Sequence, residues 1–314
     1  MAHKTVFLDE YSLGGHDLTP IRRLVDYKGF DRTSPEEVLR NCADAEIVIT
    51  NKVVLSAETM RQLPNLRFIA IAATGMNNVD LEAARELGIG VRNAAGYSTY
   101  AVAEATLSAA LSLVRETVYY DHYFKSREYA ESGTIFRYDR PIRQLRGKNW
   151  GIIGLCNIGR EVARLAEAFG CEVAYCSTSG KERPEKYERM TLEELLGWAD
   201  IVSIHSPLTD ATRNLIGSEQ FSQMKHNAII INVARGGIID ESALAEALND
   251  GTIAGAALDV FSQEPLCESP LYDLKDPYRL LASPHNAWAT DEAIARLIDC
   301  IARNIEEYIA GERH

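Results

Sequence analysis

Short apolar segments alternate with helix-forming segments along the chain of 314 residues, and this alternation limits the available folds most. Several segments are apolar throughout, as strands buried on both faces must be. The alternation predicts parallel sheets covered by helices, an α/β fold. The expected strands are Thr5–Leu8, Glu46–Thr50, Arg67–Ile71, Ile89–Arg92, Trp150–Ile153, Glu172–Cys176, Ile201–His205, Ala228–Asn232, Gly255–Leu258 and Leu280–Ala282.

Two regions interrupt this alternation and suggest two domains, as the chain length also does. Residues 98–119 have a long Ala/Leu-rich helical pattern, and residues 118–147 are polar and aromatic without a clear period. A segment of that length usually serves a function, so we interpret it as an arm or dimer loop. A new strand–helix series starts at Trp150. The final helix, expected over 291–311, has no strand of its own and is expected to pack on the first domain.

Composition excludes several classes of protein. The net charge of −12 argues against nucleic acid, since phosphate binding needs basic surface. The six cysteines have neither C-x-x-C nor zinc spacing and are interpreted as reduced thiols, and no metal site is expected. The N-terminus lacks a signal-peptide pattern, and no segment approaches the ~18 apolar residues of a membrane span. We therefore expect a cytoplasmic protein. Metal and serine hydrolases are disfavoured because H-E-x-x-H and G-x-S-x-G are absent.

The segment Gly154-Leu155-Cys156-Asn157-Ile158-Gly159 runs from an expected strand into a helix expected over 160–169. This is the context of the turn that binds a dinucleotide pyrophosphate at a helix N-terminus. Gly154 can make the tight turn, and Gly159 allows close packing of helix and strand. Cys156 replaces a glycine, and its Cβ is expected to push the pyrophosphate outward or to shift the turn. A plain strand–turn–helix remains the alternative.

Position 177, eighteen residues after Gly159, is where an acidic residue would bind the adenosine ribose hydroxyls. This chain has Ser177 there, followed by Thr178 and by the basic residues Lys181 and Arg183. Without a carboxylate, a 2′-phosphate can be accepted, so both NADP and NAD stay open. A polar surface loop is the alternative for Lys181 and Arg183.

Three polar residues follow later strands, at the sheet edge where open α/β sheets bind ligands. His285 suits a proton donor near neutral pH, and Glu264 is a carboxylate that can stabilise its protonated form. Arg235 can bind a carboxylate through two parallel hydrogen bonds. Together these residue types predict reduction of a 2-keto acid. Taken singly, Arg235 also fits a capped surface turn, Glu264 fits an N-cap before a proline, and His285 fits an ordinary loop histidine.

Several motifs together resemble the D-isomer-specific 2-hydroxyacid dehydrogenase family over nearly the whole chain. These motifs are residues 72–80 (AATGMNNVD), 154–159, 205–209 (HSPLT), 232–237 (NVARGG), 258–265 (LDVFSQEP) and Pro284-His285. The resemblance implies a Rossmann-type dinucleotide-binding domain, residues 101–287, inserted into a discontinuous flavodoxin-like substrate domain, residues 1–100 and 288–314. It also implies a homodimer formed through an arm at residues 118–147, with NAD as the usual cofactor and NADP left open by Ser177.

The resemblance also assigns roles to residues. It implies Arg235, Glu264 and His285 as the catalytic set, and substrate binding by Thr74, Gly75, Arg235 and Trp288. Asp259 would face the nicotinamide carboxamide, and His205 and Pro207 would line the cofactor cleft. The implied cofactor-binding residues are Gly154, Cys156, Asn157, Ile158, Gly159, Ser177, Thr178, His205, Pro207, Ala234, Asp259 and His285.

Within the family, residues 77–80 and 95–99 and Trp288 look most like glycerate dehydrogenases, also called hydroxypyruvate reductases. This implies reduction of hydroxypyruvate or glyoxylate to D-glycerate or glycolate. Trp288 would close over a short substrate, or would simply pack in the core. Activity on another 2-hydroxy acid, and a nucleotide-sensing role like that of the family's corepressors, remain alternatives.

Overall fold

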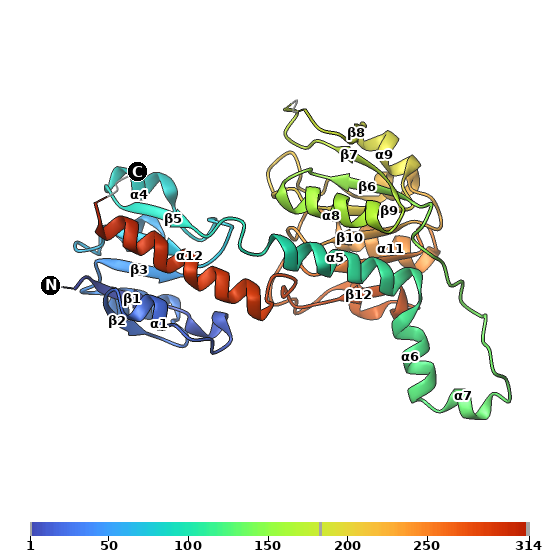
Figure 1. The fold of residues 1–314 in the computed structure, drawn as a ribbon, viewed down its shortest axis with the longest axis horizontal. Coiled ribbons are helices and arrows are strands. Elements are labelled where there is room, and N and C mark those ends of the chain that lie inside the picture. Colours follow the sequence, from blue (N-terminus) through green and yellow to red (C-terminus); the bar gives the residue numbers. More distant parts are fainter. Residues whose placement is uncertain (1, 182–183, 312–314) are drawn as a thin grey trace. The chain divides into compact units, whose positions relative to one another are not determined.

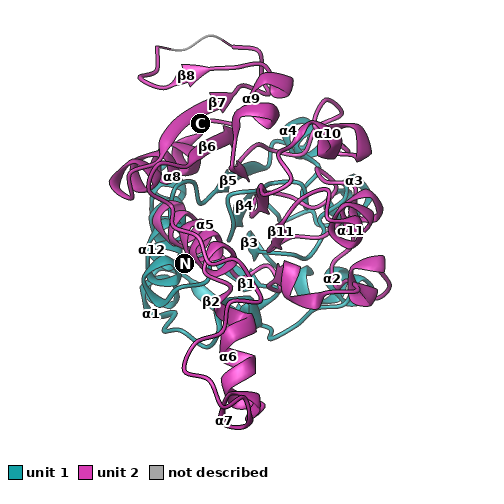
Figure 2. Ribbon diagram, turned by 90° about the vertical axis from the view of Figure 1, so that its right-hand side faces the viewer, with its two compact units in different colours: residues 1–98, 289–314 teal, residues 99–288 magenta. Residues whose placement is uncertain are grey.

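The computed structural model describes residues 2–181 and 184–311 and contains two parallel sheets (Figure 1). The chain divides into two compact units, residues 1–98 with 289–314 and residues 99–288 (Figure 2). The expected boundaries at 100 and 287 differ from these by two residues and one residue.

The sheet of the first unit has the order β2-β1-β3-β4-β5, with every pair parallel. This is the flavodoxin-like order that the sequence predicts. Its three central strands bury side chains on both faces, which explains their apolar sequences. The strands are β1 (Lys4–Phe7), β2 (Asp26–Gly29), β3 (Ile47–Thr50), β4 (Phe68–Ile71) and β5 (Gly90–Asn93).

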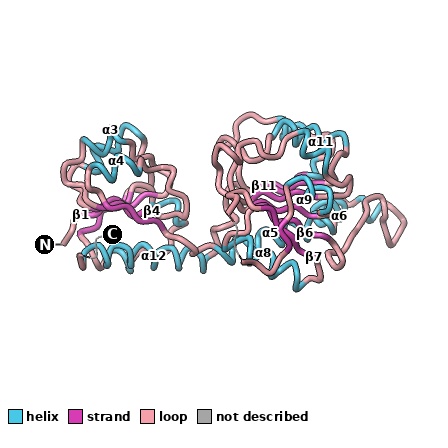
Figure 3. Tube along the Cα trace, turned by 90° about the horizontal axis from the view of Figure 1, so that it is seen from above, coloured by secondary structure: helices cyan, strands magenta, loops and turns pink. Residues whose placement is uncertain are grey.

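Helices cover both faces of this sheet, with α3 and α4 on one face and α12 on the other (Figure 3). The chain's last helix packs against β4, where the rings of Tyr308 and Phe68 stack with centroids 4.6 Å apart. Asn304 Nδ2 also donates to the Asn93 carbonyl at 3.0 Å. The final helix therefore packs on the first sheet, as predicted. The helices are α1 (Thr19–Arg22), α2 (Val38–Cys42), α3 (Ala57–Arg61), α4 (Leu81–Glu86) and α12 (Asp291–Ile309).

The sheet of the second unit has the order β12-β11-β10-β9-β6-β7-β8, again all parallel. Counted from β6, this is the Rossmann order with one further strand at the edge. The strand order reverses between β6 and β9, and a ligand is expected at their carboxyl ends. The strands are β6 (Asn149–Ile153), β7 (Glu172–Cys176), β8 (Glu188–Arg189), β9 (Ile201–Ile204), β10 (Ile229–Asn232), β11 (Gly255–Leu258) and β12 (Leu280–Ala282).

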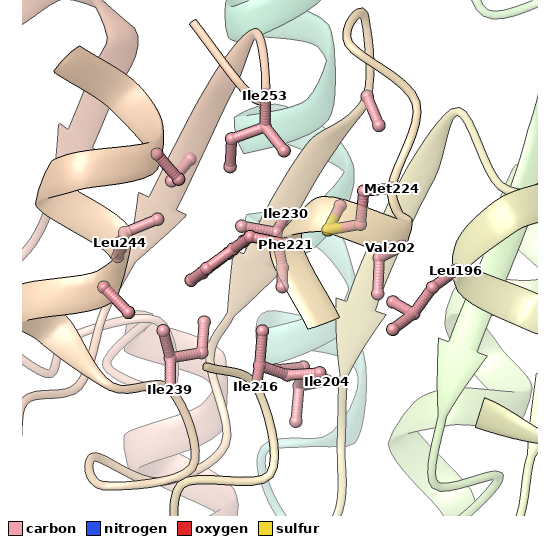
Figure 4. Close-up of a cluster of buried hydrophobic side chains, with 14 of the residues drawn as sticks. Leu196, Val202, Ile204, Ile216, Phe221, Met224, Ile230, Ile239, Leu244 and Ile253 are labelled. Carbon is pink, nitrogen blue, oxygen red and sulfur yellow. The ribbon is translucent and has the colours of Figure 1, made fainter. Parts of the chain in front are cut away.

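Two layers of helices enclose the second sheet. One layer is formed by α5 (Thr99–Val114) and α8 (Asn157–Ala168), which contact each other and the strands. The other layer comprises α9 (Leu192–Trp198), α10 (Ser218–Gln223) and α11 (Glu241–Asp250). Figure 4 shows the core beneath this layer, where Phe221 of α10 and Leu244 of α11 meet Ile230 of β10. This core fixes the strand ends that carry the candidate site.

Sequence reasoning missed the edge strands β2 and β8. Their residues are mostly exposed, so neither has the apolar run that marks a buried strand. The single helix expected over 98–119 is also wrong. It breaks into α5 and α6 (Thr117–Lys125) because Glu116 adopts a left-handed conformation, with φ 52, and its carboxylate accepts a 3.0 Å hydrogen bond from Arg140. The arm then continues through α7 (Glu128–Glu131).

Within residues 2–181 and 184–311, no helix has both the length and the apolar character needed to cross a membrane. Across the same residues, no cluster of three or more His, Cys, Asp and Glu side chains is arranged to hold a metal ion.

Candidate active site

His285 and Glu264 form a hydrogen-bonded pair on the loops that follow β12 and β11. His285 Nδ1 lies 2.7 Å from Glu264 Oε2, and both side chains are partly exposed, at 27% and 34%. The other oxygen, Glu264 Oε1, accepts a 3.1 Å hydrogen bond from the Phe261 amide. The carboxylate is therefore oriented by the backbone and is positioned to hold a proton on the imidazole.

The backbone at His285 is unusual, since its φ of 54 lies in the left-handed region that side chains other than glycine rarely adopt. Such conformations are concentrated at functional sites, where surrounding contacts stabilise them. The buried carboxylate of Asp259 supplies those contacts. It accepts hydrogen bonds from the Ser283 hydroxyl at 2.6 Å, the Asn286 amide at 2.9 Å and the Ala287 amide at 3.0 Å. Asp259 thus anchors the loop on both sides of His285, and its role toward a nicotinamide stays a prediction.

Arg235 lies in the turn after β10, and the buried side chain of Asn232 organises this turn. Asn232 Nδ2 donates to the Arg235 carbonyl at 2.8 Å, and its Oδ1 accepts from the Ala234 amide at 3.1 Å. The Arg235 guanidinium donates to the Ala234 carbonyl at 2.7 Å. The next residue, Gly236, packs so closely on the Phe261 carbonyl that a Cβ would lie 1.8 Å from that oxygen. The Arg235 turn therefore packs directly against the loop that carries Glu264.

The turn between β6 and α8 has the close packing that its glycines predict. Gly154 has φ 91, and a Cβ there would lie 2.8 Å from the Ser206 amide nitrogen. A Cβ at Gly159, in the first turn of α8, would lie 2.6 Å from the Gly154 carbonyl oxygen. Both positions exclude a side chain, so the helix N-terminus approaches the carboxyl ends of β6 and β9 closely.

A pocket of about 190 Å³ lies beside this turn. It brings together predicted residues from three segments: Gly154 and Cys156, Ser177 and Thr178, and His205 and Pro207. Asn157, Ile158 and Gly159 begin the adjacent helix, whereas Ala234 and Asp259 do not line this pocket. Leu155, Tyr175, Ser179, Lys181, Glu185 and Ser206 complete the lining.

The pocket wall contains buried polar atoms that have no hydrogen-bond partner in the described part of the protein. These are both ring nitrogens of His205 and the hydroxyl of Ser206. Burial lowers the pKa of His205 to about 3, so the imidazole is neutral near pH 7. Unpaired buried polar groups cost free energy, and proteins usually satisfy them with water or a ligand. The pocket therefore fits a polar ligand that supplies these hydrogen bonds.

Cys156 has an ordinary backbone conformation at the N-cap of α8, with φ −85. Its thiol donates to the His205 carbonyl at 3.2 Å, and its amide donates to the Gly154 carbonyl at 2.9 Å. The replacement of glycine thus ties the turn to the end of β9, because the side chain is bonded to the neighbouring strand. Whether it displaces a pyrophosphate, as expected from the sequence, stays a prediction.

The pocket lining beside Ser177 contains an acidic residue, although position 177 itself lacks one. Glu185 lines the pocket with a side chain only 13% exposed, and Arg160 Nε of α8 donates to its Oε1 at 3.2 Å. The hydroxyls of Ser177 and Ser179 lie 3.5 Å apart. Lys181 lines the same pocket, and Arg183 lies outside the described residues. The pocket thus combines hydroxyl, cationic and anionic groups.

Comparison with known proteins agrees with this geometry. Residues 107–287 match the family model described as D-isomer specific 2-hydroxyacid dehydrogenase, NAD binding domain. The chain is 38% identical over 313 residues to a glycerate dehydrogenase of Methylorubrum extorquens, covering 99% of this chain and 98% of that enzyme. The chain belongs to the D-isomer-specific 2-hydroxyacid dehydrogenase family.

Two further relatives extend the comparison. A hydroxypyruvate reductase of Blautia hydrogenotrophica is 34% identical over 325 residues, covering 98% of this chain and 97% of that enzyme. The structure of an NADPH-dependent glyoxylate/hydroxypyruvate reductase from Sinorhizobium meliloti, in complex with NADP and malonate, superimposes with a TM-score of 0.82 at 25% identity. That alignment covers 99% of this chain and 94% of the other.

The remaining residues that the family implies lie elsewhere. Thr74 and Gly75 follow β4 in the first unit, where Asn93 Nδ2 donates to the Thr74 carbonyl at 2.6 Å. Trp288 is the last residue of the second unit and is half-buried. Their roles toward a substrate stay predictions.

Sequence reasoning missed the supporting residues. Asn232 lies within a motif already identified, and Ser206 lies between two predicted residues, so both had a local signal. Glu185 had no local signal in the sequence, because it lies in the irregular segment before the edge strand β8, and only the fold brings that segment to the pocket.

Proposed function

We propose that this dehydrogenase-family protein reduces a small 2-keto acid, such as hydroxypyruvate or glyoxylate, to the D-2-hydroxy acid with NADH or NADPH. The observation that carries the proposal is the 2.7 Å contact between His285 Nδ1 and Glu264. A histidine held by a carboxylate at the carboxyl edge of a Rossmann-type sheet suits proton transfer next to a bound dinucleotide.

His285 is the proton donor in this proposal. With Nδ1 directed to Glu264, the other ring nitrogen, Nε2, is the atom that gives the proton to the keto oxygen. Glu264 keeps the ring oriented and stabilises the imidazolium before the proton leaves. In the reverse direction, Nε2 of the neutral ring takes the hydroxyl proton.

Substrate binding falls to Arg235, whose planar guanidinium presents parallel N–H donors to a carboxylate. Its partial burial strengthens such a contact. For the backbone amides of Thr74 and Gly75 we retain the role that the family implies, binding of the substrate. Trp288 is proposed to restrict the substrate side chain to a small size.

The pocket beside the β6–α8 turn is proposed to hold the dinucleotide. The N-terminus of α8 offers its first amides to the pyrophosphate, and two residues of the pocket lining, His205 and Ser206, have buried polar atoms without a hydrogen-bond partner among the described residues. When bound, the nicotinamide supplies the hydride that the keto carbon receives. Ser177, Thr178 and Lys181 accommodate the adenosine ribose, with or without a 2′-phosphate.

A screen of 2-keto acids against NADH and NADPH tests this proposal. Addition of hydroxypyruvate or glyoxylate is expected to cause oxidation of NADH or NADPH. Chiral analysis of the product formed from hydroxypyruvate is expected to identify D-glycerate. If neither cofactor binds in a fluorescence titration, or no 2-keto acid is reduced, the proposal is wrong.

We also propose that the protein is a homodimer formed through the arm at residues 118–147. Large apolar side chains are exposed there: Phe124 at 68%, Ile135 at 76%, Phe136 at 68% and Tyr138 at 80%. Large apolar side chains exposed together on one segment often mark an interface. Light scattering is expected to give a mass near twice 34.9 kDa, and a doubly substituted F136S/Y138S protein is expected to be monomeric.

The proposed compartment is the cytoplasm. All six cysteines are free thiols, which is compatible with a reducing environment.

A further inference from the structure

Cys156 is the feature of the dinucleotide turn that the proposed function leaves without a role. Its side chain lines the pocket together with His205, which is only 6% exposed and whose ring nitrogens both lack a partner. The Cys156 thiol and a residue with unsatisfied polar atoms therefore line the same pocket. This pocket begins at the N-cap of a twelve-residue helix, where the first amides favour negatively charged ligands.

None of the other five cysteines lines this pocket. Burial raises the pKa of Cys42 to about 12 and that of Cys171 to about 11, so neither forms much thiolate near pH 7. Burial also raises the pKa of Cys176. Cys267 is exposed in the loop after β11, and Cys300 is half-buried on α12. Neither lines the dinucleotide pocket.

We propose that Cys156 is a modification site at which low-molecular-weight disulfides react with the thiol. Modification of Cys156 and dinucleotide binding exclude each other. The inference rests on the proposed function, because it takes the pocket's ligand to be the dinucleotide. A cysteine in place of a glycine thereby makes cofactor binding sensitive to the thiol–disulfide state of the surroundings.

The geometry explains why the two exclude each other. The sulfur lies 3.2 Å from the His205 carbonyl oxygen, which leaves no room for a substituent between these atoms. An added group must therefore extend to the open side of Cys156, which is the pocket of about 190 Å³. There it occupies the space in front of the first amides of α8. The modified sulfur also loses the proton that it donates to His205.

The exchange reaction balances without a further reactant. The Cys156 thiol releases its proton to solvent, and the resulting thiolate attacks one sulfur of the small disulfide. That disulfide bond breaks, a new sulfur–sulfur bond joins Cys156 to one half, and the other half leaves as a thiolate. A dithiol such as dithiothreitol reverses the reaction by the same chemistry.

The experiment uses the full-length protein with C267S and C300S substitutions, which remove the exposed thiol of the loop after β11 and the half-buried thiol of α12. The probe is 4,4′-dithiodipyridine, an uncharged disulfide, and peptide mass spectrometry measures the modified fraction of Cys156 over time. At a dinucleotide concentration of twenty times Kd, the free protein is about twentyfold depleted, so modification is expected to slow about twentyfold. When the protein is modified in the absence of dinucleotide, cofactor binding is then measured by fluorescence. The bound fraction is expected to fall in proportion to the modified fraction of Cys156 and to recover after treatment with dithiothreitol.

A C156S substitution in the same background is the matched control. Its serine cannot exchange with a disulfide, so the probe is expected to leave its cofactor binding at the untreated level. Equal modification rates with and without saturating dinucleotide would overturn the inference, as would normal cofactor binding by the fully modified protein. In both cases the proposed function would stand. Absence of any dinucleotide binding by the untreated protein would overturn both proposals.

Discussion

The loops around His285 and the turn around Cys156 belong to the same unit. They differ in whether the residues present are the types expected for the role of each region. Arg235, Glu264 and His285 are the residue types that reduction of a 2-keto acid needs, and two of them are in contact at 2.7 Å. At the dinucleotide turn, Cys156 and Ser177 replace a glycine and an acid. Proton transfer accepts few side chains, because few titrate near neutral pH. Dinucleotide binding relies more on backbone amides and pocket shape, and it tolerates substitution better.

The two regions also differ in how their polar groups are satisfied. The loop of His285 is held by the carboxylate of Asp259 through three hydrogen bonds. The pocket instead leaves both ring nitrogens of His205 without partners in the described residues. The protein's own hydrogen bonds therefore hold the His285 loop in place, whereas the pocket has polar groups that a bound ligand can satisfy.

Among substitutions outside His285, the largest effect is expected from Arg235→Lys. A lysine cannot reproduce the two parallel hydrogen bonds to a carboxylate, so kcat/KM should fall about 100-fold, close to the ~3 kcal/mol of a charged hydrogen bond. Most of the change should appear in KM for the keto acid. Steady-state kinetics measure it, with the exposed Arg164→Lys of α8 as the control. An unchanged KM would remove Arg235 from the substrate site.

Glu264→Gln is expected to lower kcat about 30-fold, since an amide orients the imidazole but does not stabilise its positive charge. The affinity for the reduced cofactor, measured by fluorescence, should change little. Glu268→Gln in the same loop is the control and should retain full turnover. Equal kcat values for the two variants would show that the ion pair has no part in the chemistry.

Ser177→Asp acts on the other region and should have a smaller effect. A carboxylate at this position repels a 2′-phosphate, so the kcat/KM ratio of NADH to NADPH should rise about tenfold, or ~1.4 kcal/mol. Ser222→Asp, an exposed position on α10, controls for the added charge. If the ratio stays the same, residue 177 does not contact the adenosine ribose.

The remaining prediction concerns a different quantity, the pH dependence of stability. Burial lowers the pKa of His205 from 6.5 to about 3, so between these values the unfolded state binds more protons. Stability should therefore be fully present above about pH 6.5 and should decrease as the pH falls toward 3. His205→Gln should reduce this slope by up to ~1.4 kcal/mol per pH unit, as measured by urea unfolding. The exposed His226→Gln is the control, and identical slopes for the His205 variant and the wild type would contradict the burial effect.

Much of the fold was accessible from the sequence because the central strands are apolar on both faces. All ten expected strands are present within a residue or two, and the two sheets have the strand orders of the fold types that the family resemblance implies. The edge strands β2 and β8 lack that signal since solvent covers them. The break at Glu116 depends on an ion pair with Arg140, which lies 24 residues away and has no local pattern.

The site shows the same division. His285, Glu264 and Arg235 were identified by their chemistry at strand ends, which needs no knowledge of packing. The support of the His285 loop by Asp259, and the approach of Glu185 to the pocket, depend on segments that meet only in the folded chain. Residues proposed to perform chemistry therefore carry a signal in the sequence, whereas the contacts between distant segments that support them do not.

The most direct test is to measure turnover and cofactor binding together in His285→Ala. The Kd for the reduced dinucleotide should stay within about threefold of the wild type, while the single-turnover rate of keto-acid reduction falls by about 10²–10⁴. That result would separate proton transfer at His285 from dinucleotide binding at the pocket. A wild-type reduction rate in His285→Ala would contradict the central claim.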